Sequence, residues 1–129
     1  MVAPTPSPIT GSILKCLRQL LVVDSEDKSF DIDLLIFGNG ALSIMSQLGV
    51  GPADGFRIND ESETWADFIG NRTDLDLIQT DVYLRMRLVF DPPQNSFLVK
   101  GIQDQIAEYD WRIEAWHKKP HDIEQVTGV

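Results

Sequence analysis

The sequence predicts an all-α protein, a compact bundle of about four helices with an extra short helix. Three observations support this prediction. Apolar residues recur at steps of three and four along several separate stretches, which is the period of an amphipathic helix. Residues that start or stop helices flank these stretches. The chain has 129 residues, 43% of them hydrophobic, which suits one globular domain that buries its own core.

The longest apolar stretch, FDIDLLIFGNGALSIMSQLGVG at residues 30–51, predicts the central helix. Its apolar residues cover most of the helical circumference, and such a helix is usually buried. Asp31 and Asp33 favour the positive end of the helix dipole, and Gly49 predicts a left-handed stop. The segment Gly38-Asn39-Gly40 leaves two alternatives open, because glycine weakens a helix. It permits either close packing against a neighbour or a real break.

Capping residues predict where the other helices begin, and a proline pair ends one of them. Asp91-Pro92-Pro93 stops a long helix at residue 90, because a residue before proline avoids helical geometry. The predicted caps are Thr10 or Ser12 for a helix at 12–23, Asp60 with Glu63 for a short helix at 64–69, Thr73 with Asp76 for the helix ending at 90, and Asn95 or Ser96 for a helix at 97–117.

Apolar faces predict how the first and last helices pack. In the first helix the predicted face includes Leu20 and leaves Arg18 outside. In the last helix the steps alternate between four and three, and we expect this seam to pack on the central helix. Trp111 falls off the seam and is a candidate anchor for a partner. The seam consists of Ile102, Ile106, Tyr109, Ile113 and Trp116.

Composition sets the expected organisation as a flexible N-terminal arm at 1–11, a helical domain at 12–117 and a flexible tail at 118–129. The arm contains several prolines and lacks the basic and apolar parts of a signal peptide. No apolar run is long enough for a membrane span. Cys16, the one cysteine, lies in an apolar stretch and is predicted to be a core residue. These features predict a reducing, cytosolic setting.

The net charge of −9 is concentrated in the middle of the chain. Nucleic-acid binding needs clustered lysine and arginine, so this composition argues against tight binding of DNA or RNA. Three interpretations of this acidity remain open. It keeps the protein soluble, it prevents a surface from adhering to DNA, or it binds a basic partner. The acids between residues 54 and 81 are Asp54, Asp60, Glu61, Glu63, Asp67, Asp74, Asp76 and Asp81.

We find no catalytic, cofactor-binding or metal-ligating pattern in the sequence. His117 and His121 are four residues apart, but Pro120 interrupts the helix that would align them. A helical metal-dependent hydrolase would need two pairs of acids facing inward. The candidate pairs, spaced four residues apart, are Asp104 with Glu108 and Asp110 with Glu114. Because Asp104, Glu108 and Asp110 lie off the apolar seam, we interpret them as a solvated face. The sequence therefore predicts no enzyme and no cofactor.

Three stretches together resemble the head–tail connector proteins of long-tailed bacteriophages, also called adaptor or head-completion proteins. They are the central FDIDLLIFGNGALSIMSQLGVG, ETWADFIG at 63–70, and LRMRLVFDPPQNSFLVKGIQDQIAEYDWRIEAW at 84–116. The most specific pieces are QLGVG at 47–51, WADF at 65–68 and RLVFDPP at 87–93. Family members tend to carry bulkier residues where this chain has Gly38 and Gly40. This departure puts the straightness of the central helix in question.

The resemblance implies a structural virion protein in the neck between head and tail, present in the host cytoplasm during assembly. It implies a homo-oligomeric ring beneath the portal protein that meets a stopper or tail-completion protein below. Double-stranded DNA would pass through the ring without specific binding. The portal-binding candidates are Tyr109, Trp111, Ile113, Trp116, His117, Lys118 and Lys119, and the channel-facing candidates are Asp54, Asp60, Glu61 and Glu63. A small acidic regulator that binds a basic protein is the alternative.

Overall fold

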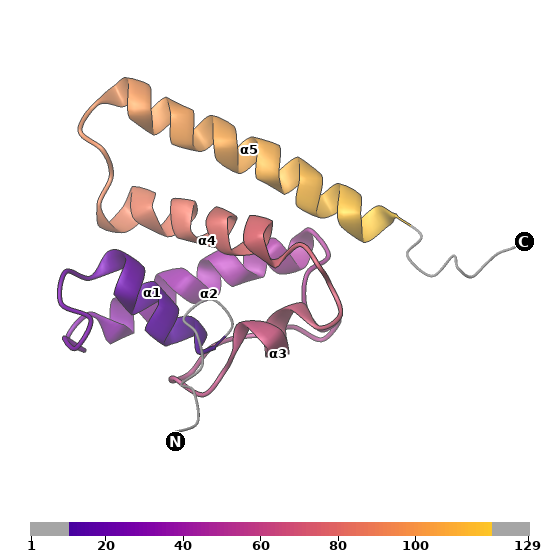
Figure 1. Cartoon of the computed structure of the whole chain (residues 1–129), viewed down its shortest axis with the longest axis horizontal. Coiled ribbons are helices and arrows are strands. Elements are labelled where there is room, and N and C mark those ends of the chain that lie inside the picture. Colours follow the sequence, from indigo (N-terminus) through magenta and orange to yellow (C-terminus); the bar gives the residue numbers. More distant parts are fainter. Residues whose placement is uncertain (1–10, 120–129) are drawn as a thin grey trace, which may run out of the picture.

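The computed structural model describes residues 11–119, and this part of the chain folds into five helices (Figure 1). The predicted all-α bundle is confirmed. No helix of the described part is long and apolar enough to cross a membrane. Residues 1–10 of the predicted arm and most of the predicted tail, His121 included, lie outside the described residues. The helices are α1 (Ile13–Leu21), α2 (Asp31–Gln47), α3 (Trp65–Ile69), α4 (Leu75–Phe90) and α5 (Ser96–Lys118).

Helix α4 is the central helix of the bundle. It packs against α1, α2 and α5, and Figure 1 shows α5 on one side of it and α2 on the other. The sequence predicted the central place for residues 30–51, and this was wrong. Helix α2 buries only one stripe, which includes Leu34, Leu42 and Met45. Its other side exposes large apolar side chains, such as Ile32 at 71% and Ile36 at 61%.

Helix α2 is continuous through Gly38-Asn39-Gly40, so close packing is the alternative that holds. A Cβ atom added to Gly38 would lie 3.2 Å from Leu17 Cδ1, closer than an ordinary van der Waals contact. Asn39 accepts a hydrogen bond from the Ile58 N–H at 2.7 Å and donates one to the Ile58 carbonyl at 2.9 Å. The loop that follows α2 is therefore fastened to the middle of the same helix.

The predicted stop of α2 at Gly49 is confirmed. Gly49 has a φ of +100°, a conformation that glycine adopts at little cost. The Val50 N–H then donates to the Met45 carbonyl at 3.0 Å, which satisfies a carbonyl at the helix end. Because Val50 is also buried, the chain turns back over the core at this point.

Helix α1 begins as predicted, with the Ser12 hydroxyl accepting from the Lys15 N–H at 3.2 Å, and Cys16 is a core residue. Its predicted face was wrong at two positions. Arg18 is buried, with 4% exposure, whereas Leu20 is half-exposed. Arg18 is buried because two carboxylates neutralise it: it donates to Asp31 at 3.0 and 2.8 Å and lies 2.8 Å from Glu61. This ion pair joins α1 to the start of α2.

Two predicted helix caps were wrong, because other residues stand at the N-cap positions of α3 and α4. Helix α3 is capped by Thr64 and Asp67, which exchange hydrogen bonds of 3.1 and 3.2 Å. Glu63 instead accepts from the N–H groups of the preceding loop. Helix α4 begins after Asp74, whose carboxylate binds Arg72 and caps no N–H. Within α3, Trp65 is buried in the core.

Helix α5 begins as predicted, since the Asn95 side chain accepts from the Phe97 N–H at 2.7 Å. It packs mainly on α4 (Figure 1), so the prediction that its seam packs on the 30–51 helix was wrong. Ile102 and Ile113 are the buried residues of the seam. Helix α4 lies between α5 and α2, and the apolar seam of α5 packs against an apolar face of α4.

Candidate functional site

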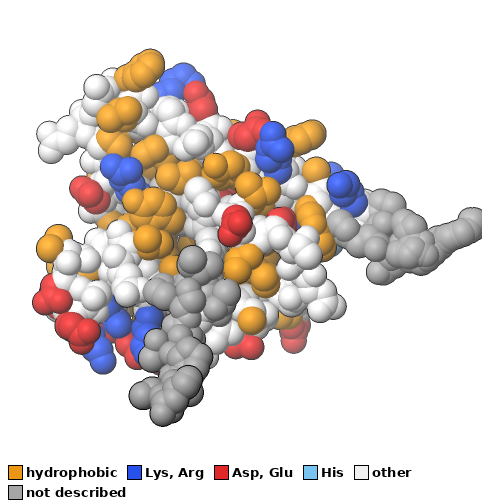
Figure 2. Space-filling model, viewed as in Figure 1, with side chains coloured by type: hydrophobic (Ala, Val, Ile, Leu, Met, Phe, Trp, Pro, Cys, Tyr) orange, Lys and Arg blue, Asp and Glu red, His pale blue; other side chains and the backbone are white. Residues whose placement is uncertain are grey.

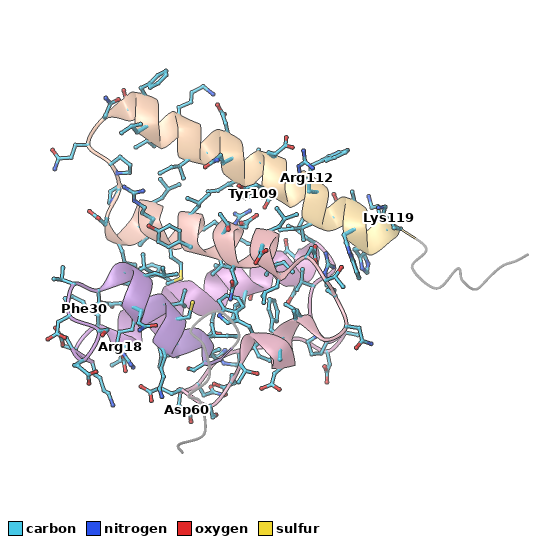
Figure 3. All side chains as sticks on the ribbon, in the orientation of Figure 1. Arg18, Phe30, Asp60, Tyr109, Arg112 and Lys119 are labelled. Carbon is cyan, nitrogen blue, oxygen red and sulfur yellow. The ribbon has the colours of Figure 1, made fainter. Side chains whose placement is uncertain are left out.

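The C-terminal end of α5 carries the predicted portal-binding residues, and the structure divides them into two groups. Trp111, with 68% exposure, lies on the surface together with His117, Lys118 and Lys119. Figure 3 shows Lys119 at the end of α5. Ile113 is fully buried, and Tyr109 and Trp116 are partly buried. Only the exposed group can contact a partner while α5 stays packed.

Arg72 holds this end of α5 in place. It donates to the Asp74 carboxylate at 2.9 and 2.7 Å, to the Gly49 carbonyl at 3.2 Å and to the Ile113 carbonyl at 2.9 Å. Its guanidinium also lies 4.3 Å from the centre of the Trp116 ring, at cation–π distance. Arg72 therefore joins three segments: the loop after α2, the start of α4 and the end of α5.

Arg72 was not among the functional residues predicted from the sequence, although one signal was present. Arg72 is a basic residue in a stretch where acids predominate, two residues before Asp74. That spacing indicates an ion pair, but it cannot show that the arginine is buried or that it reaches α5. The contact with Ile113 spans 41 residues of sequence. Only the folded chain reveals it.

The channel-facing candidates lie in the loop that leads to α3, and most of them have partners within the subunit. Asp54 is exposed in a turn closed by the Gly55 N–H and the Pro52 carbonyl. Asp60 accepts from Ser62 at 2.8 and 2.5 Å. Figure 3 shows Asp60 on the side of the molecule away from α5.

The other two candidates stabilise the fold. Glu61 is paired with Arg18 at 2.8 Å, and Glu63 accepts from the N–H groups of Asn59 and Asp60 at 3.0 and 3.2 Å. A carboxylate that is neutralised by an arginine repels DNA less than a free one. Asp54 and Asp60 are therefore the candidates with the most available charge.

A network of two carboxylates and one arginine lies between α4 and α5. Arg85 donates to Asp81 at 2.6 Å and to Asp110, which the sequence analysis had placed on a solvated face. Burial, and next the hydrogen bond with Asp110, raise the pKa of Asp81 to about 7, against the opposing effect of Arg85. Asp81 is fully buried, and no donor from the described residues lies within hydrogen-bond distance of its Oδ2 atom. At neutral pH the Asp81 carboxyl group is therefore protonated for part of the time.

An apolar groove of about 480 Å³ runs over α4, between α2 and α5. Arg85 is its charged residue, and the network above neutralises it. On the face drawn in Figure 2, apolar side chains gather across the middle of the molecule and charged ones lie mostly around them. The residues that line the groove are Phe37, Ala41, Ile44, Arg85, Met86, Leu88, Val89, Gln103 and Ile106.

The paired acids of α5 bind basic residues rather than each other. Asp104 pairs with Lys100 at 2.9 Å, and Glu108 pairs with Arg112 at 2.6 Å, in both cases four residues apart on the helix. Among residues 11–119 no three His, Cys, Asp or Glu side chains come together in a way that could hold a metal ion. The arrangement required for a helical metal-dependent hydrolase is not formed by these residues.

These features define a class of protein. An acidic helical subunit with exposed apolar helix faces and a basic helix end is suited to contacts with other proteins. A family model described as phage connector protein matches residues 13–119. The chain belongs to this family of structural phage proteins, as the resemblance in its sequence predicted. None of the curated proteins and none of the solved structures matches the chain.

Proposed function

We propose that this protein is a subunit of a ring-shaped head–tail connector that docks beneath the portal, extends the DNA channel and joins the head to a stopper or tail-completion protein. The family match over residues 13–119 is the observation that carries this proposal. The role is structural, without catalysis or a cofactor, and its place is the neck of the virion after assembly in the host cytoplasm. The test is whether heads that lack this chain fail to join tails until the purified protein is added.

The portal contact lies on the exposed end of α5. Trp111 supplies a large apolar anchor, and His117, Lys118 and Lys119 supply donors for carbonyl or carboxylate groups of the portal. Ile113 takes part indirectly, because its burial keeps α5 on the core. Arg72, which donates to the Ile113 carbonyl, fixes where the exposed residues lie.

Binding of the protein to heads that carry the portal tests this contact. We expect Trp111→Ala, and separately Lys118→Glu with Lys119→Glu, to weaken binding by about tenfold or more, because anchors at an interface dominate its affinity. Val23→Ala and Lys15→Glu are the matched controls, since both residues are exposed and distant from the end of α5 in the sequence. Equal binding of all the variants would contradict this site.

The acidic loop faces the DNA channel in this proposal, with Asp54 and Asp60 as its available charges. Like charge keeps DNA from adhering as it passes. We expect Asp54→Lys to leave ring formation intact and to slow the release of DNA from the virion. Glu26→Lys makes the same charge change in the exposed loop before α2 and should have no effect. Release at the normal rate in both variants would exclude the channel role of Asp54.

The regulator alternative is less well supported by the folded chain. Glu61 and Glu63 are engaged within the subunit, and Asp74 and Asp81 are paired with arginines. Much of the acidic stretch is therefore not free to meet a basic partner.

A further inference from the structure

Two apolar patches on different helices are left uncovered by the subunit. The α2 patch consists of Ile32, Ile36, Gly40 and Ile44, which follow each other at steps of four and so form one line along the helix. The α5 patch consists of Phe97, Leu98 and Gly101 near the start of α5. Phe97 is 81% exposed. Helices α2 and α5 lie on opposite sides of α4 (Figure 1), and Ile44 is the one residue of the two patches that lines the groove between these helices.

Each patch contains a glycine that the subunit itself does not require. A Cβ atom added to Gly40 or to Gly101 would meet no atom within 4 Å, whereas one added to Gly38 would press on Leu17. Glycine within a helix is less favourable than alanine, so the presence of glycine at an exposed helical position needs an explanation. Close approach of a surface from outside the subunit is a reason that applies to both positions, because each glycine lies beside large exposed apolar residues.

The charges around the patches favour a second copy of this chain as the occupant. Copies with a net charge of −9 repel each other, and they approach most easily through faces that carry little charge or opposite charge. Helix α2 has two acids and no basic residue, and one of the acids, Asp31, is neutralised by Arg18. Asp33 is thus the unpaired charge beside the α2 patch. Lys100 lies beside the α5 patch; its side chain is 72% exposed, and its ion pair with the similarly exposed Asp104 leaves it open to solvent and to a second carboxylate.

We propose that the α2 patch of one copy packs against the α5 patch of the next copy in the ring. The inference rests on the proposed connector function and names its subunit interface. A closed ring needs two different, mutually complementary surfaces on each subunit, because every contact is head-to-tail. Asp33 of one copy approaches Lys100 of the next, and the two glycines let the helices come close together. The portal contact stays separate, at the other end of α5.

Leucine at either glycine tests the interface without removing a contact inside the subunit. Gly40→Leu and Gly101→Leu fill space that is open in the subunit and replace a weak helix former by a strong one, so both variants should fold. Each should weaken ring formation by about tenfold or more, through overpacking at the contact. Ala107→Leu, at another exposed position of α5, is the matched control and should form rings normally. Circular dichroism checks the fold, and native mass spectrometry with and without portal-bearing heads measures assembly.

Mixing the two leucine variants gives a sharper result. The Gly40→Leu protein keeps an intact α5 patch and the Gly101→Leu protein keeps an intact α2 patch, so one of each forms a pair that cannot grow. We expect heterodimers and no rings in the mixture. Normal rings from either variant, or loss of rings from only one of them, would overturn the interface while leaving the connector function intact. A wild-type protein that forms no ring even on portal-bearing heads would overturn the connector function itself.

Discussion

Replacing Arg72 with methionine removes the side chain that ties the end of α5 to α4 and to the loop after α2. The side chains of Arg72 and Asp74 are 6% and 7% exposed, so their ion pair is buried. Its loss leaves the Asp74 carboxylate and the carbonyls of Gly49 and Ile113 without the donors they now have. Removing one partner of a buried pair costs about 3–5 kcal/mol. Methionine keeps an apolar contact with the Trp116 ring.

Urea unfolding, followed by circular dichroism and tryptophan fluorescence, measures this loss. Arg112→Met is the matched control, because Arg112 is 55% exposed and pairs with an equally exposed Glu108 on the same helix (Figure 3). Such exposed pairs contribute about 0.3–0.5 kcal/mol. We expect the Arg72 variant to lose several times more stability than the control. A difference below about 1 kcal/mol, the upper range for an exposed pair, would refute the assigned role of Arg72.

Other perturbations test the core and the network between α4 and α5. Asp81 has a pKa of about 7 in the folded protein, above its ordinary value of 3.8, so the folded state holds the proton more tightly and stability should fall as pH rises between these values. Asp81→Asn should flatten this decline in unfolding measurements from pH 5 to 8, and equal slopes would contradict the buried carboxyl pair. Gly38→Ala should cost about 1–3 kcal/mol through overpacking against Leu17, offset by up to about 1 kcal/mol from the better helix propensity of alanine. Gly40→Ala has the same gain without the overpacking and should stabilise the isolated subunit by up to about 1 kcal/mol, so Gly40→Ala should have the higher melting temperature of the two. Asn95→Ala should cost about 0.5–2 kcal/mol in urea unfolding by removing the cap of α5, and an unchanged midpoint would show that the cap is dispensable.

The sequence was sufficient to predict the helices but not their neighbours. Helical periodicity, the prolines after α4, the Gly49 stop and the Asn95 cap are local signals, and the structure confirms them. Which helix is central depends on contacts between distant segments. An apolar face predicts that something covers it, but it does not say whether the cover comes from the same chain or from another. The prediction for α2 was wrong because its outer side is not covered by its own subunit.

The polar part of the candidate site was the least predictable from sequence. Arg18 and Arg72 occupy positions that a hydropathy pattern assigns to solvent, yet each is buried because carboxylates from distant segments or neighbouring turns neutralise it. Asp110 was predicted to be solvated for the same reason and instead bonds to Arg85 across the interface of α4 and α5. Helical periodicity predicts which face of its own helix a side chain lies on. It does not predict which charged residue of another segment will lie beside that side chain in the folded protein.

The Arg72 junction also determines how the subunit responds to mechanical force. A tail joined to a head transmits tension and torque through the neck, and in the proposed connector that load enters each subunit at the end of α5. Because Arg72 bonds there to the start of α4 and to the loop after α2, the load is divided between two segments before it reaches the seam of α5. Peeling α5 from α4 one turn at a time would first require breaking this junction. Pulling single molecules by the C-terminal end of α5 should therefore show a lower rupture force in Arg72→Met than in Arg112→Met.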